Sequence, residues 1–359
     1  MPVSISGTNG VTFPDSSLQA AAASPYVLKN RLVNGSFGIA QRGTSFTSTS
    51  SLNNDDTYNL DRWFVLSDGN DIVDITQETS TVPTNELTAI ALDVETINKK
   101  FGIAQIIEQV NCIGAIGNTV TLSFQAKVSA TTKLDNVKCA IVAWSGTADT
   151  VTSDIISAWG AEGTNPTLIA NATYENTPVN LNLTTSYATY SVSAAVDTAS
   201  TKNIIVFIWS DVTDTTLGDF LYITNAQLEV GSTATPFERR LYNQELANCQ
   251  RYAFVTDGSM SNTGAVSNAG SGTVQQRIIF PVVMRVAPSA AVNTSGSWIV
   301  SNDYNADYTA STVSVSAVGA STQGCRINLA GFASLPAAGT ILGGLFSSGT
   351  GKLIFSSEL

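Results

Sequence analysis

The most regular pattern in the chain is an alternation of apolar and polar positions over residues 119–128. Because successive side chains of a strand point to opposite faces, the alternation of Val120, Leu122 and Phe124 with polar neighbours predicts a strand with one face on a core. Similar segments recur as far as residue 230, separated by clusters of Gly, Asn, Asp and Thr. The predicted strands are residues 62–66, 71–78, 87–94, 103–110, 119–128, 137–144, 189–196, 204–209 and 220–230.

This series of strands predicts an all-β fold with two sheets, and we expect a jelly roll. Between residues 26 and 230 nothing longer than a turn has a helical period, and many short strands without helices are typical of such folds. The interval 145–186 has weak periodicity and predicts a large loop or a hairpin excursion on one rim. Trp63, Trp144 and Trp209 lie inside strand-like segments, which indicates core positions.

A change of period after residue 236 predicts a short helix over roughly residues 238–252. Its apolar stripe follows the i, i+4, i+7, i+11 spacing of one helix face. The residues of the stripe are Tyr242, Leu246, Cys249 and Ala253. A helix this short is not stable alone in water, so we expect it to pack beneath the jelly roll or against copies of itself.

The last part of the chain predicts a second, smaller β-sandwich. Turn residues become dense after residue 254, and strand-like segments then return. These are residues 274–283, 297–300, 312–318, 326–330, 340–346 and 352–355. The final segment would tie the C-terminus into a sheet.

The predicted organisation has four parts. Residues 1–25 lack a sustained apolar pattern, so they are either an attachment segment that leans on another surface or a disordered leader. The jelly roll spans residues 26–237 and the linking helix residues 238–254. Residues 255–359 form the second sandwich, which we expect to be distal and to bind a receptor.

Composition excludes several functions. Charged residues make up only 13% of the chain and the net charge is −11, which argues against nucleic-acid binding because phosphates need clustered Lys or Arg. The chain has no histidine, which excludes Ser-His-Asp and Cys-His catalysis. No metal site of the zinc type is expected, because Cys112, Cys139, Cys249 and Cys325 are widely spaced.

The same cysteines are predicted to be buried thiols. The first 19 residues show neither a basic nor an apolar region of a secretory signal, so disulfides are not expected. No apolar run approaches the roughly 18 residues of a membrane-spanning helix, and we expect no membrane insertion.

Five short motifs carry a family resemblance. Residues 227–231 (QLEVG), 234–240 (ATPFERR) and 245–252 (ELANCQRY) resemble, in this order, a run found in many bacteriophage tail fibre and tail-tip proteins. Residues 34–43 (NGSFGIAQRG) and 60–63 (LDRW) resemble the opening of the same proteins. The resemblance covers about residues 26–254 and implies a homotrimer that is joined to other tail proteins through its N-terminal segment.

A second resemblance concerns architecture. The opening NGSF, the tryptophan that soon follows, and the closing strand YITNAQLE are similar to jelly-roll carbohydrate-binding modules. Fold alone does not establish sugar binding.

Two segments combine aromatic rings with planar polar groups, the mixture that sugar recognition needs. One is the interval 145–186, with Trp159 and Tyr174. The other is a turn-rich segment that we expect to be exposed. Its candidate glycan-binding residues are Trp298, Asp303, Tyr304, Asp307 and Tyr308. The alternative is that Trp298 is a core residue and the tyrosines only anchor loops.

Acidic residues leave two further alternatives open. A glycosidase needs two carboxyl groups facing each other across a sugar, and the long loop offers Asp154, Glu162 and Glu175. Loop acids are more often solvated charges, so no catalytic residue is predicted. Ca²⁺ could bind at either of two loose acidic groups, although solvated turns are the simpler interpretation. The groups are Asp68, Asp71 and Asp74, and Asp211, Asp214 and Asp219.

We therefore predict a viral tail fibre protein without enzyme activity or cofactor, made in the host cytoplasm and located in the phage tail of the virion. It would attach to the host by multivalent, non-covalent binding to cell-surface glycans. One alternative is a tailspike that depolymerises the glycan. The other is a structural adaptor or virion-surface protein without receptor binding.

Overall fold

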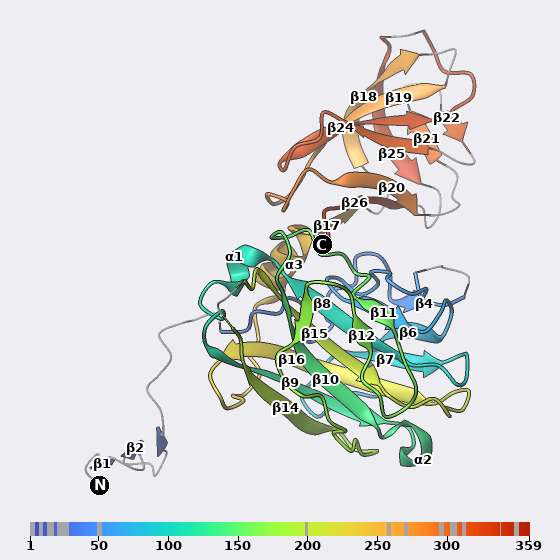
Figure 1. Cartoon of the computed structure of the whole chain (residues 1–359). Coiled ribbons are helices and arrows are strands. Elements are labelled where there is room, and N and C mark those ends of the chain that lie inside the picture. Colours follow the sequence, from blue (N-terminus) through green and yellow to red (C-terminus); the bar gives the residue numbers. More distant parts are fainter. Residues whose placement is uncertain are drawn as a thin grey trace.

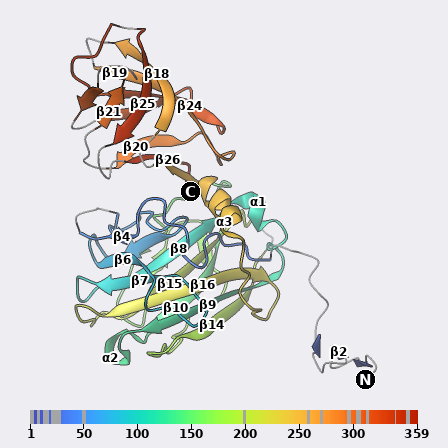
Figure 2. The same cartoon turned by 180° about the vertical axis from the view of Figure 1, so that it is seen from behind.

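The computed structural model confirms the all-β fold class (Figures 1 and 2). The first strands, β1 (Ser4–Ser6), β2 (Gly10–Thr12) and β3 (Leu18–Gln19), form a small antiparallel sheet. The structure describes residues 4–6, 10–12, 18–19, 29–48, 52–197, 200–256, 260–268, 272–293, 298–301, 307–310, 314–337, 339–347 and 352–359.

Two antiparallel sheets form a jelly roll. The six-stranded sheet has the order β14-β9-β16-β7-β6-β4 and the five-stranded sheet the order β13-β10-β15-β8-β5. The chain changes sheet at each step from β7 to β10 and again from β14 to β16, which is how a jelly roll is wound. The six-stranded sheet contains β4 (Ser45–Phe46), β6 (Val73–Glu78), β7 (Ala89–Val94), β9 (Thr119–Val128), β14 (Ala188–Ala195) and β16 (Phe220–Val230). The five-stranded sheet contains β5 (Phe64–Ser67), β8 (Phe101–Ile107), β10 (Val137–Trp144), β13 (Ala172–Tyr174) and β15 (Asn203–Ser210).

The main apolar core lies between these sheets. Leu122 and Phe124 of β9 face Ile141 of β10 and its neighbours, and all three are buried. Trp63 and Trp209 are fully buried, as their positions in strand-like segments predicted. The four cysteines are buried free thiols, again as predicted.

The long interval after β10 is an excursion, as expected. It contains the hairpin β11 (Ile156–Ala158) and β12 (Thr167–Leu168), and β13 then joins the five-stranded sheet. Figure 1 shows β11 and β12 lying across that sheet. A second apolar cluster fills the space between them, with Trp159 of the excursion packed against Phe207 of β15. The outer face of the five-stranded sheet is therefore covered by protein.

Three helices interrupt the strands in the described part of the chain. Helices α1 (Gln109–Cys112) and α2 (Thr131–Leu134) are single turns, and α3 (Tyr242–Gln250) is the predicted linking helix. Cys249 and Ala253 of its predicted stripe are buried, but Tyr242 is 65% exposed. The prediction was wrong for Tyr242 because the helix packs on the jelly roll through later residues, such as Glu245, whose carboxylate accepts a hydrogen bond from the Asn34 backbone amide. No helix among the described residues is long and apolar enough to cross a membrane.

A smaller β-sandwich follows α3 (Figure 2). Its sheets have the orders β17-β26-β20 and β22-β21-β25-β18-β19-β24-β23. A separate apolar core, which includes Ile327, Leu329 and Phe355, lies within it. The first sheet contains β17 (Ala253–Thr256), β20 (Ser289–Asn293) and β26 (Lys352–Ser356). The second contains β18 (Met260–Asn268), β19 (Thr273–Ile279), β21 (Trp298–Ser301), β22 (Asp307–Ala310), β23 (Ser314–Val318), β24 (Gly324–Ala330) and β25 (Ile341–Ser347).

The C-terminal residues connect the two sandwiches. In Figure 1 the C-terminus lies between the jelly roll and the smaller sandwich, next to α3. Strand β26 is paired on both sides, as predicted for a terminal strand, and Glu358 follows it. The Glu358 carboxylate forms ion pairs with Arg42, at 3.2 Å, and with Arg62. All three side chains are at most 5% exposed, so this is a buried charge cluster.

The opening motif of the sequence builds the jelly-roll side of this junction. The side chain of Asn34 bonds both backbone groups of Ile39 at 2.9 Å and the carbonyl of Asp61 at 3.0 Å. The indole of Trp63 donates to the Asn34 carbonyl at 3.0 Å. Gln41 then bonds the Asp61 carboxylate. These side chains hold the loop that carries Arg42 and Arg62.

We predict that Glu358→Gln lowers the free energy of unfolding by about 3 kcal/mol, because it removes the carboxylate with which both buried arginines pair. Urea denaturation followed by tryptophan fluorescence measures this effect. Glu95→Gln, at an exposed glutamate, is the control. Equal stability of the two variants would contradict a structural role for the buried pair.

Candidate functional site

The segment with the predicted glycan-binding residues 298–308 contains a hairpin. Strands β21 and β22 pair so that Val300 lies opposite Tyr308 and Ser301 opposite Asp307. The expectation of an exposed turn is therefore wrong for Tyr308, which is partly buried against the core of the smaller sandwich, while Asp307 is exposed. Asp303 and Tyr304 lie outside the described residues, as does the side chain of Trp298. A glycan site there stays a prediction.

The two aromatic candidates in the long excursion belong to its packing. Trp159 is only 8% exposed and meets Phe207 edge-on at 5.9 Å between ring centroids. Tyr174 is partly buried against the same cluster, and its hydroxyl donates to the Pro166 carbonyl at 2.8 Å. The structure therefore places Trp159 in a core, where no sugar can stack on it.

Each acidic residue of the excursion has its own hydrogen-bond partners or acidic neighbours. Glu162 accepts hydrogen bonds from the backbone and hydroxyl of Thr213, and Glu175 accepts one from the Asp197 amide. Asp154 lies near another pair of acids, Asp55 and Asp56. Each of the three acids therefore has its own neighbours in the structure.

The carboxylates considered for Ca²⁺ also have protein partners. Asp211 is buried between Lys100 and Lys138. Asp68 pairs with Lys99 at 3.1 Å, and Asp71 accepts a hydrogen bond from Asn53 at 2.7 Å. Over the described ranges no three Cys, Asp or Glu side chains come together as a metal site requires.

A different surface, the outer face of the six-stranded sheet, combines aromatic rings with polar groups. Leu221 and Ile223 of β16 are buried in the core, so Phe220 and Tyr222 point to the opposite face. Their ring planes lie within 13° of parallel, with centroids 5.5 Å apart. Lys127 of β9 lies directly opposite Tyr222.

The charged residues of this face lie beside the rings. The Lys127 ammonium is 5.3 Å from the Tyr222 ring centroid and 5.8 Å from that of Tyr187. On the other side of β16, Asp93 lies opposite Phe220. All of these side chains are partly exposed. We call this surface the aromatic face and define it as Lys127, Tyr187, Phe220, Tyr222 and Asp93.

Asp93 is a weaker acid than an ordinary aspartate. Burial raises its pKa to about 6, and the nearby charges of Glu95, Asp74 and Asp219 act in the same direction. At neutral pH the group is mainly a carboxylate, which accepts hydrogen bonds from hydroxyl groups.

A groove continues the aromatic face along β9. It has a volume of about 330 Å³ and lies between the sheet and the segment 234–237. Gln125, two positions from Lys127 on the same face, lines it together with Thr189 and Asn225. Asn225 donates to Gln125 at 2.9 Å, and its own side-chain oxygen has no partner among the described residues. Amide groups of this kind recognise hydroxyls next to an aromatic surface.

Known proteins offer only distant likenesses. No family model matches the sequence, and a search of curated proteins finds no match either. Among solved structures, the enzymatically active domain of bacteriophage CBA120 tailspike protein 4 is similar over 57% of this chain and 22% of that one, at 16% identity and a TM-score of 0.34.

Two binding modules give a similar result. TmCBM61, solved in complex with β-1,4-galactotriose, covers 56% of this chain and 99% of its own, at 14% identity and a TM-score of 0.29. The CBM22-1 xylan-binding domain from Paenibacillus barcinonensis Xyn10C covers 60% and 100%, at 13% identity and a TM-score of 0.30. Values this low assign neither a family nor a ligand to this chain.

The aromatic face could not be predicted from the sequence because a bulge in β16 changes which residues point to each side of the sheet. The register of β16 against β9 shifts between Thr224 and Gln227, and Asn225 has a φ of 54°. Leu221 and Ile223 face the core before the bulge, whereas Ala226 and Leu228 face it afterwards. A single alternation drawn through all of these residues therefore mixes both faces.

We predict that Asp56→Asn stabilises the protein at pH 7.5 by about 1–2 kcal/mol, a range that allows for partial exposure. Burial raises the pKa of Asp56 to about 7, and the nearby charges of Asp55 and Asp154 act in the same direction. Between about pH 4 and 7 the unfolded chain releases this proton while the folded protein retains it, so stability falls as the pH rises. Asparagine also suits the φ of 62° at this position.

Urea unfolding at pH 4 and pH 7.5 tests this. The advantage of the variant should be present at pH 7.5 and nearly absent at pH 4. Asp68→Asn, at an aspartate whose side chain is 45% exposed, is the control. An equal effect at both pH values would show that the titration of Asp56 does not contribute.

Proposed function

We propose that this protein is a phage tail fibre component that attaches the particle to its host by binding a surface glycan on the aromatic face, without cleaving it. The observation that carries the proposal is the row formed by Lys127, Tyr222 and Phe220 on the outer face of a sheet. The resemblance of the sequence motifs to tail fibre and tail-tip proteins supports the biological setting.

The chemistry of the aromatic face fits a sugar ring. The C–H groups of a pyranose pack against aromatic surface, here the surface that the stacked pair of Phe220 and Tyr222 leaves exposed. Asp93 accepts hydrogen bonds from sugar hydroxyls, and the amide of Gln125 donates and accepts them further along the groove. Each such contact is weak, so attachment would rest on several sites that act together.

Oligomerisation supplies the number of sites. In the proposed homotrimer three aromatic faces bind one surface, and the second and third contacts form at high effective concentration. The N-terminal segment would join the other tail proteins in the virion, after synthesis in the host cytoplasm. The smaller sandwich, residues 255–359, would be the distal part, and a second glycan contact at 298–308 belongs to the same proposal.

We expect Tyr222→Ala to weaken glycan binding by roughly tenfold per site, since it removes one of the two stacking rings. A glycan array probed with the labelled full-length protein measures this and identifies the sugar. The matched control is Tyr242→Ala, which removes a tyrosine that is 65% exposed and lies outside the aromatic face.

Unchanged binding by Tyr222→Ala would remove the aromatic face from the proposal. Release of reducing ends from a bound polysaccharide would show a depolymerase instead. Absence of binding to every glycan and to host cells would favour an adaptor that contacts only virion proteins.

Light scattering of the full-length protein should give a mass near three times 37.6 kDa. Trimers assembled from mixtures of wild-type and Tyr222→Ala chains should lose cell adhesion steeply as the fraction of variant chains rises. The reason is that avidity depends on the number of intact sites in each trimer. A monomer that adheres to cells as strongly would contradict the multivalent mechanism.

A further inference from the structure

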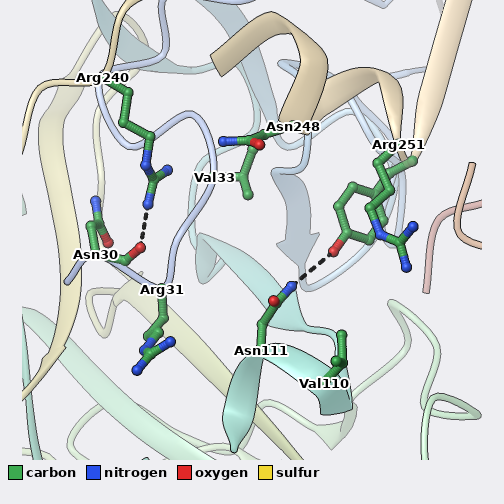
Figure 3. Close-up of a pocket in the computed structure, with 9 residues that line it drawn as sticks. Asn30, Arg31, Val33, Val110, Asn111, Arg240, Asn248 and Arg251 are labelled. Atoms are coloured by element: carbon green, nitrogen blue, oxygen red, sulfur yellow. Dashed lines mark hydrogen bonds between the residues drawn. The ribbon is translucent and has the colours of Figure 1, made fainter. Parts of the chain in front are cut away.

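A pocket on the jelly roll, separate from the aromatic face, is lined by three arginines. Its volume is about 400 Å³, and residues 30–33, α1 and α3 form its walls. Figure 3 shows Arg31 and Arg240 on one side of it and Asn111 and Arg251 on the other. Such a concentration of guanidinium groups is unexpected in a chain with a net charge of −11.

Two of the three arginines are neutralised by the protein. Arg240 pairs with Glu245 at 3.0 Å and also donates to the Leu32 carbonyl at 2.8 Å. Arg251 pairs with Glu108, with its two nitrogens 2.7 and 3.0 Å from the carboxylate oxygens. These groups form rigid walls without a net charge.

Arg31 differs from both. Its guanidinium has no hydrogen bond or ion pair with any described residue, and its Nε atom is buried without a partner. The side chain as a whole is partly exposed and lines the pocket. The two terminal nitrogens of Arg31 are not among its buried atoms, so they are the donors that a ligand in the pocket would meet.

The remaining walls suit a small polyhydroxylated ligand. The side-chain amide of Asn111 lies 3.5 Å from the Tyr252 hydroxyl, and that of Asn248 lies 3.4 Å from the Glu245 carboxylate, both at the outer limit of a hydrogen bond. Both amides therefore have capacity for further partners. Val33 and Val110 add apolar surface.

We propose that this pocket binds the carboxylate of an acidic sugar, of the uronic acid class, through the guanidinium of Arg31. The planar fork of an arginine matches the two oxygens of a carboxylate. Because Glu245 and Glu108 neutralise the other two arginines, the pocket offers one positive charge. That favours a singly charged carboxylate over a doubly charged phosphate. Asn111 and Asn248 would bond the sugar hydroxyls.

The test is isothermal titration of the full-length protein with glucuronate and galacturonate, and with glucose, galactose and inorganic phosphate for comparison. We expect the uronates to bind at least about tenfold more tightly than the neutral sugars and phosphate, and Arg31→Gln to remove that difference. Arg31→Lys should restore only part of it, because a lysine keeps the charge and loses the fork. Binding should weaken as salt is raised.

The controls separate this site from the aromatic face and from a folding defect. Arg277→Gln makes the same charge change at an exposed strand position and should bind uronates like the wild type. Tyr222→Ala should also keep uronate binding, so failure of one site leaves the other testable. Since the Arg31 side chain has no bond to the described protein, its variants should melt at the wild-type temperature.

Three outcomes would overturn the proposal. Equal binding of uronates and phosphate, unchanged in Arg31→Gln, would show an adventitious anion site. Equal binding of acidic and neutral sugars would show that the pocket does not recognise the carboxylate charge. A lower solution mass of Arg31→Gln together with no uronate binding by the wild type would show that a carboxylate of a second copy fills the pocket.

Discussion

The carboxylate of Glu358 lies between the guanidinium groups of Arg42 and Arg62 at the contact between the two sandwiches. Buried charges are costly to remove from water, and within the described structure Arg42 Nη1 and Arg62 Nε are buried without a hydrogen-bond partner, so the cluster depends on its ion pairs. Arg62 also donates to the Ile106 carbonyl, and its guanidinium lies 3.7 Å from the centre of the Tyr252 ring. These contacts join the smaller sandwich to the jelly roll.

This junction also fixes the end of α3. Tyr252, which covers Arg62, donates its hydroxyl to Glu108 at 2.9 Å, and Glu108 in turn holds Arg251. Arg285 adds bonds to the carbonyls of Ser357 and Glu358, both at 2.7 Å. The chain of contacts from the C-terminal residues to the wall of the arginine pocket is therefore continuous.

The motifs that resemble tail proteins have structural roles. Gln227 is fully buried and accepts a hydrogen bond from the Glu238 amide at 2.8 Å, while Glu229 binds the amide and hydroxyl of Thr235. The Glu238 carboxylate accepts a hydrogen bond from the Asn30 amide. These residues therefore hold the first segment of the jelly roll against the segment that follows its last strand. The resemblance therefore reflects how the fold is closed, and it does not identify the residues that would contact a ligand.

What the sequence predicted follows from local pattern. The predicted bounds of β9, β10 and β16 agree with the observed strands, and α3 agrees with the change of period. Strand β18 was missed because Asn262 and Gly264 indicate turns, whereas pairing with β19 and β25 on both sides outweighs their propensity. The arginine pocket was beyond prediction, because Arg31, Asn111 and Arg240 come from distant segments.

The two proposed sites depend on different forces and lie on the same sandwich. Stacking on Phe220 and Tyr222 is nearly independent of ionic strength, whereas an ion pair to Arg31 is screened by salt. Both sites lie on the jelly roll, whose common core holds them in one arrangement. A rigid arrangement loses little entropy when several sites bind at once, so weak individual contacts combine into firm attachment. A host surface that carries both neutral and acidic sugars would be bound more firmly than one that carries either alone.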